Sequence, residues 1–118
     1  MTVRRVKTYT SQTGYVYQYY FVGKRPAIQS HAPGTEYIFD VSSDRKTTYP
    51  VSILLPVREL DAWVSAHGRS LTEAEQYAVV KMRLFQAFDE IGDMRQTGQS
   101  LRVDGISMAA AAETLGLA

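Results

Sequence analysis

The sequence contains no cysteine, and this absence excludes several classes of function at once. A disulfide framework, a zinc ribbon, an iron–sulfur site and a thiol nucleophile all need that side chain. A charge excess is missing too, because 13 basic residues face 12 acidic ones and leave a net charge of +1. The chain as a whole therefore has no electrostatic drive toward nucleic acid or a membrane.

Long apolar segments are also absent. The most apolar run, residues 49–56, is too short to span a bilayer and contains two prolines. The basic start of the chain is followed by polar residues, where a secretory signal would be apolar. We therefore expect a cytoplasmic protein with no membrane contact.

The amino-acid composition of the 118-residue chain changes near residue 56. Seven of the eight tyrosines lie in residues 1–50, whereas Ala, Leu, Glu and Met, which favour helices, dominate afterwards. This order predicts an α+β fold: a four-stranded antiparallel β-meander, then two helices packed on one face, plus a short C-terminal helix. We expect a single α+β domain over residues 1–93, with a polar connection and a short helical tail over residues 94–118.

The predicted strands cover residues 3–10, 15–22, 35–42 and 47–55, with a loop at 23–34. In the second hairpin the apolar residues occupy odd positions on both strands. Odd residues must therefore face odd residues, which predicts an odd-length loop at residues 44–46.

The first hairpin allows two registers. A two-residue loop at 12–13 places Lys7 opposite Gln18, while a three-residue loop ending at Gly14 places it opposite Tyr19. We prefer the first because it buries no charge. The core then receives the aromatic residues at odd positions, which are Tyr15, Tyr17, Tyr19 and Phe21.

Local signals predict three helices. The first covers residues 57–66 and stops at Gly68. The second begins at Thr72, whose spacing to Glu75 is that of a capping box, and ends near residue 91. A short Ala-rich helix is expected over residues 107–115.

The tail carries a resemblance in residues 106–117, where four alanines precede Leu115 and Gly116. This segment resembles the first helix of the helix-turn-helix in excisionase-like and MerR-like DNA-binding domains. The recognition helix of that motif would begin where the sequence ends, so we expect no DNA-contact residue here. A helix of small residues that docks closely on the domain or on a partner subunit is the expected outcome.

Catalytic and cofactor motifs are absent. His31 and His67 have no metal-ligand partners at fixed spacing, and neither dinucleotide nor phosphate-loop glycine patterns occur. We therefore predict no catalytic residue, no cofactor and no metal ligand. The first functional hypothesis is a non-enzymatic binding or interaction module.

Two surfaces are predicted for such a module. Apolar helix residues exceed what one sheet face needs, which favours a homodimer, with a further protein partner possible. The predicted interface residues are Tyr77, Met82, Phe85 and Leu115. The alternative function is a nucleic-acid-binding regulatory protein that uses the basic, tyrosine-rich first hairpin through Arg5, Lys7, Tyr9 and Tyr20.

Acidic residues crowd the end of the long helix, where the helix dipole favours cations. Asp89 and Asp93 also repel each other at a spacing of four, with Glu90 beside them. Such a local conflict predicts a compensating contact. We expect an arginine to pair with at least one of these three carboxylates.

Overall fold

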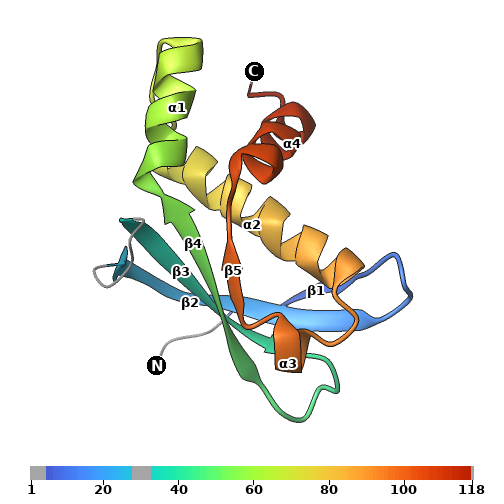
Figure 1. Cartoon of the computed structure of the whole chain (residues 1–118). Coiled ribbons are helices and arrows are strands. Elements are labelled where there is room, and N and C mark those ends of the chain that lie inside the picture. The colour runs from blue at the N-terminus through green and yellow to red at the C-terminus, as the bar shows by residue number, and fades with distance from the viewer. Residues whose placement is uncertain (1–4, 28–32, 118) are drawn as a thin grey trace.

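The computed structural model describes residues 5–27 and 33–117 as one sheet with helices on one of its faces (Figure 1). The strands are β1 (Lys7–Thr10), β2 (Val16–Ala27), β3 (Gly34–Ser42), β4 (Tyr49–Pro56) and β5 (Ser100–Arg102). The helices are α1 (Val57–His67), α2 (Glu73–Glu90), α3 (Met94–Thr97) and α4 (Gly105–Leu115). The α+β prediction is confirmed, with the strand β5 and the short helix α3 added to the predicted elements. The beginning predicted for the first strand, at residue 3, lies outside the described residues.

The sheet runs in the order β1-β2-β3-β4-β5, and its first four strands are antiparallel. The added strand β5 pairs in parallel with β4, and backbone bonds from Ser52 N to Gln99 O (2.8 Å) and from Val103 N to Leu54 O (2.9 Å) flank the pairing. A parallel neighbour needs a long crossover, which α1, α2 and α3 supply. The sheet thus includes residues from both predicted parts of the chain, and the division at residue 93 stays a prediction.

The second hairpin has the predicted register, because Val41 pairs with Tyr49 and Phe39 pairs with Val51. All four side chains are buried on the face that α2 covers. Sheet and helix together bury the largest core residues, among them Tyr37, Phe39, Ile53, Leu55, Val80, Leu84 and Phe88.

The preferred register of the first hairpin is wrong, since Lys7 lies opposite Tyr19 and Tyr9 lies opposite Tyr17. This pairing turns the Tyr9 ring toward α2, where it stacks on Phe85 with centroids 4.4 Å apart. Lys7 shares that face but stays exposed, because a long side chain at a sheet edge can reach water. Aromatic packing therefore outweighs the cost of placing a charged residue on the sheet face that α2 covers.

β2 continues five residues beyond its predicted end, through a bulge between Phe21 and Gly23. The extra residue shifts the alternation, so that Lys24 pairs with Tyr37 and lies on the helix-covered face. Pro26 is tolerated because β2 is paired with β3 alone at that point among the described residues.

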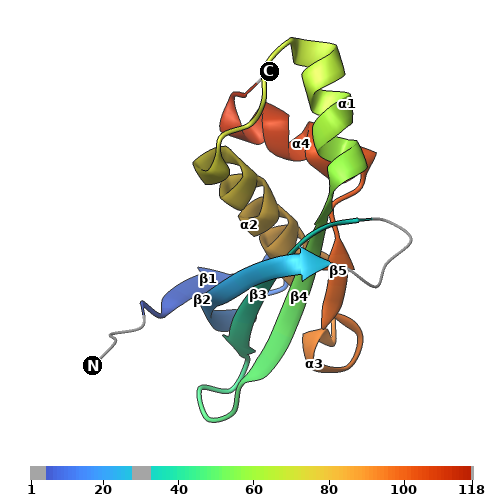
Figure 2. The same cartoon turned by 90° about the vertical axis from the view of Figure 1, so that its left-hand side faces the viewer.

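Helices α1, α2 and α4 lie on the same side of the sheet, with α2 crossing it (Figure 2). The predicted capping box of α2 is present, and α1 ends at Gly68 with a φ of 70°. α4 has its own capping box, in which Asp104 accepts from the amide of Ser107 (2.8 Å). Its buried residues, Ser107, Met108, Ala111 and Ala112, dock it on the domain.

Candidate functional site

A cleft of about 240 Å³ opens where the edge of the sheet meets the first half of α2. Arg5 precedes β1, Tyr77 comes from α2, and the other lining residues are Lys7, Tyr19, Tyr20 and Phe21. Lys81 adjoins it, with its Nζ 5.7 Å from the ring centroid of Tyr77 and 5.9 Å from that of Tyr19. We define the cationic cleft as Arg5, Lys7, Tyr19, Phe21, Tyr77 and Lys81.

Two local features build the cleft. The register of the first hairpin sets Lys7 beside Tyr19 on the helix-facing side. On α2, a spacing of four residues puts Tyr77 and Lys81 on the same face of the helix. The Tyr77 ring then meets Phe21 edge to face, with centroids 5.1 Å apart, and joins the helix to the sheet edge.

Positive charges meet in this cleft. Burial lowers the pKa of the Lys81 ammonium, and the neighbouring positive charge of Lys7 lowers it further. In the described part of the chain, no carboxylate lines the cleft, and Arg5, Lys7 and Lys81 form no ion pair. An anion bound here would relieve the repulsion between the two ammonium groups.

Four cations elsewhere in the described part of the chain, Lys24, Arg25, Arg58 and Arg69, have acidic partners. Arg69 pairs with Glu75 at 3.1 Å, and this contact helps to lower the pKa of that carboxyl. Lys24, farther along β2, lies 3.5 Å from the Oε1 of Glu73. The cationic cleft differs from these places because its cations have no acidic partner among the described residues.

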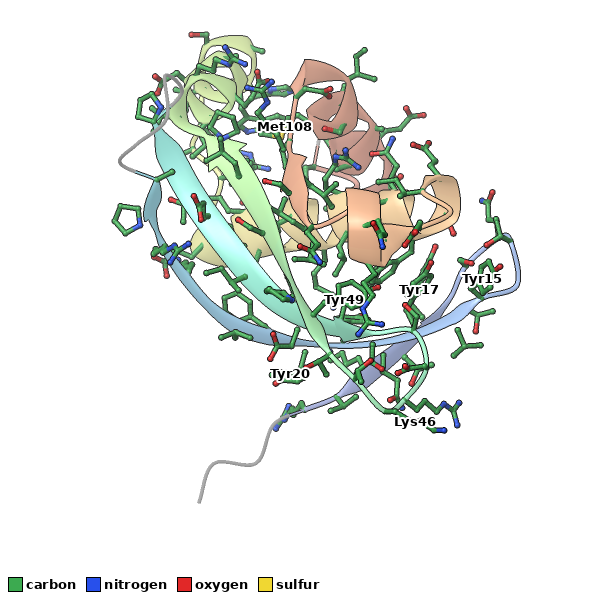
Figure 3. The ribbon with its side chains drawn as sticks, turned by 60° about the horizontal axis from the view of Figure 1, so that its bottom comes forward. Tyr15, Tyr17, Tyr20, Lys46, Tyr49 and Met108 are labelled. Carbon is green, nitrogen blue, oxygen red and sulfur yellow. The ribbon has the colours of Figure 1, made fainter. Side chains whose placement is uncertain are left out.

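The structure brings together only part of the predicted nucleic-acid face. Arg5 and Lys7 share the cleft, while Tyr9 lies farther along the same face, beside Asp89. Tyr20 borders the cleft, but its side chain lies on the sheet face away from the helices (Figure 3), where its hydroxyl donates to Asp40 of β3. The one-residue difference in register explains this separation, because it moves one strand's side chains to the other face.

Sequence reasoning missed Phe21 and Lys81 as site residues. Phe21 belongs to the predicted core, yet it is 40% exposed, because it lies at the edge where β1 no longer covers β2. Lys81 has one signal in the sequence, since it is a cation four residues from both Tyr77 and Phe85, within the apolar stripe of the helix. Its proximity to Lys7 depends on the packing of α2 against the hairpin.

A second hollow, of about 580 Å³, lies between α2 and α4. The predicted interface residues Met82 and Phe85 line it, while Tyr77 lies in the cationic cleft instead. Leu115 packs against the core from α4. All four side chains are partly buried within the single chain, and the interface stays a prediction.

The acidic group at the end of α2 has contacts other than the predicted arginine. Asp89 accepts from the Tyr9 hydroxyl (2.8 Å) and from the amide of Gln12 (2.9 Å). Glu90 is 3.5 Å from the side-chain amide of Gln86, and Asp93 caps α3. The two hydrogen bonds to Asp89 tie the tip of the first hairpin to α2. The arginine pairing stays a prediction.

A third hollow, of about 280 Å³, lies below α3, where Tyr15, Tyr17 and Tyr49 approach one another (Figure 3). Tyr49 Oη is 2.9 Å from Ser43 Oγ, and the Arg95 guanidinium lies 6.0 Å from the centroid of the Tyr49 ring. Tyr17 is buried, which raises the pKa of its hydroxyl. Two acidic residues, Asp44 and Asp93, and one basic residue, Arg95, line this hollow, unlike the cationic cleft, which no carboxylate lines.

The described residues hold no group of three or more metal-ligating His, Cys, Asp or Glu side chains. His67 stacks on Trp63 at a centroid distance of 3.6 Å, and its Nδ1 is 3.1 Å from the Trp63 carbonyl oxygen. His31 lies outside the described residues. No described helix is both long and apolar enough to cross a membrane.

No protein-family model, curated protein sequence or solved structure gives a significant match to this chain.

Proposed function

We propose that this protein is a non-enzymatic, cytoplasmic binding module, and that its cationic cleft holds the phosphate groups of an anionic ligand. The observation that carries the proposal is the juxtaposition of Lys7 and Lys81 in a cleft without a carboxylate. Placing two ammonium groups together costs free energy in the empty protein, and such local conflicts tend to mark functional sites. Both functions predicted from the sequence are binding functions, and the cationic cleft supports the proposal of a binding function.

Binding of inorganic polyphosphate, measured by calorimetry at low salt, tests this proposal. We expect Lys7→Gln and Lys81→Gln each to weaken binding, because each removes one cation from the cleft. The logarithm of the binding constant should fall linearly with the logarithm of the salt concentration, and less steeply in either variant.

Lys46→Gln is the matched control. This lysine is exposed on the loop between β3 and β4, away from the cleft (Figure 3). Its loss should leave binding unchanged within experimental error. An equal loss of binding in all three variants, or no binding by the unchanged protein, would contradict the proposal.

A homodimer is the second proposal, and the hollow between α2 and α4 favours it. Met82 and Phe85 leave apolar surface there, beside the small exposed side chain of Ala110. Sedimentation should show a dimer that Met82→Glu dissociates, because the substitution places a charge in the interface. A monomer at high micromolar concentration would contradict it.

A further inference from the structure

We infer that the ligand of the cationic cleft is a single-stranded nucleic acid, with one base stacked on Phe21 and its phosphates beside Lys7 and Lys81. This inference rests on the proposed function and adds to it the part of the ligand that is not phosphate. It depends on the aromatic half of the cleft, which a simple phosphate site would not need.

Phe21 is the residue that carries this step. It has ring neighbours at centroid distances of 5.1 Å (Tyr77), 5.4 Å (Phe39) and 6.1 Å (Tyr37), and these fix its orientation. Even so, 40% of its surface remains exposed in the cleft that Arg5 and Lys7 line. A ring held rigidly and left partly open beside cations provides a stacking surface for a base.

Cations lie on both sides of this ring. Lys7 and Lys81 lie toward Tyr19, while Lys24 lies toward Tyr37, with its Nζ 5.7 Å from that ring centroid. A strand whose base rests on Phe21 would therefore have positive charge on either side for its phosphates. Because Lys24 also pairs with Glu73, the stronger attraction is at the end with Lys7 and Lys81.

The size of the cleft argues against a duplex. The cleft between the sheet edge and α2 has a volume of about 240 Å³, which is room for a single unpaired nucleotide. In a duplex, bases are stacked on one another and their faces are not accessible to a protein ring.

Fluorescence anisotropy of a labelled oligothymidylate of about ten nucleotides tests the inference at low salt. Unlabelled duplex of equal length, inorganic polyphosphate and a tyrosine-phosphorylated peptide serve as competitors. We expect Phe21→Ala to weaken binding of the oligonucleotide about tenfold or more, as the loss of one stacked base would. Binding of polyphosphate should stay within twofold of that of the unchanged protein.

Val22→Ala is the matched control, since this neighbouring side chain is 51% exposed but does not line the cleft. It should leave both affinities unchanged. If Phe21→Ala fails to fold, Phe21→Leu retains apolar volume without the ring and should show the same selective loss.

Three results would overturn the inference while leaving the proposed function intact. These are an unchanged affinity of Phe21→Leu for the oligonucleotide, competition by duplex as strong as that by the single strand, and tighter binding of the phosphopeptide. In each case Lys81→Gln would still weaken polyphosphate binding. Absence of any binding to oligonucleotide and to polyphosphate would instead contradict the proposed function itself.

Discussion

The first hairpin meets α2 at two places, and their chemistry is opposite. At the C-terminal end of the helix, Asp89 accepts hydrogen bonds from Tyr9 and Gln12. Near the middle of the helix, Lys81 lies beside Lys7, and like charges face one another. The same pair of elements is thus held by satisfied polar contacts at one place and carries a charge conflict at the other.

This difference separates stability from binding. An acceptor that satisfies two donors stabilises the folded chain, so the Asp89 end holds the hairpin in place. Repulsion between the ammonium groups of Lys7 and Lys81 cannot stabilise the fold. At this place the contacts of Lys81 with the rings of Tyr19 and Tyr77 join the helix to the hairpin instead. Substitutions at the two places should therefore affect different measurements.

The largest effect on stability is expected from Asp89→Ala. It removes both hydrogen bonds that hold the tip of the hairpin, and bonds to a charged group are worth about 1.5–3 kcal/mol each when protected. Because Asp89 is only half-buried, we expect a total loss of about 2 kcal/mol in chemical denaturation. Glu90→Ala, at the exposed neighbouring position, should cost less than about 0.5 kcal/mol. Equal losses would show that the Asp89 contacts do not hold the hairpin.

Tyr9→Phe should have an intermediate effect, about 1 kcal/mol, because it removes the hydroxyl and keeps the stacked ring. Burial and the nearby Asp89 raise the pKa of Tyr9 to about 12, so the folded protein keeps a proton that the unfolded chain loses above pH 10. The Tyr9 contribution is therefore complete below pH 10 and is lost as the pH rises toward 12. Denaturation at neutral and alkaline pH should show a shallower alkaline fall in stability for Tyr9→Phe; an unchanged fall would contradict the assignment.

The smallest effect, of opposite sign, is expected from Lys7→Gln. Removing one of two like charges should raise the free energy of unfolding by up to about 0.5 kcal/mol at low ionic strength. Added salt should abolish this gain, since it screens exposed charges. Lys46→Gln serves as the reference for removal of an exposed lysine outside the cationic cleft. A loss of more than about 1 kcal/mol in Lys7→Gln would show that this lysine is structural.

Local patterns made much of the fold predictable. The Thr72 capping box and the stop at Gly68 depend on residues only a few positions apart, and both are present. The apolar residues of β3 and β4 occupy odd positions, so the loop between these strands had to contain an odd number of residues. Only that register buries the apolar faces of both strands together. β5 had no such pattern, since a strand of three residues is too short to show a period.

The cationic cleft was predicted only in part. Arg5 and Lys7 stood out because basic and aromatic residues alternate in the first hairpin. Lys81 could not be joined to them, because more than seventy positions separate it from Lys7 in the sequence. The bulge after Phe21, which sets the face that Lys24 occupies, has no signature in the local composition.

By itself, the amino-acid sequence determined the α+β class, the presence of α1, α2 and α4 and the register of the second hairpin, since short-range propensity, capping and alternation specify these features. Only the tertiary structure decided the register of the first hairpin, where stacking of Tyr9 on Phe85 outweighed the exclusion of Lys7 from the helix-covered face. The same packing brought Lys81 to Lys7 and created the cationic cleft. Such contacts depend on how α2 lies across the sheet, and that arrangement is a property of the whole core.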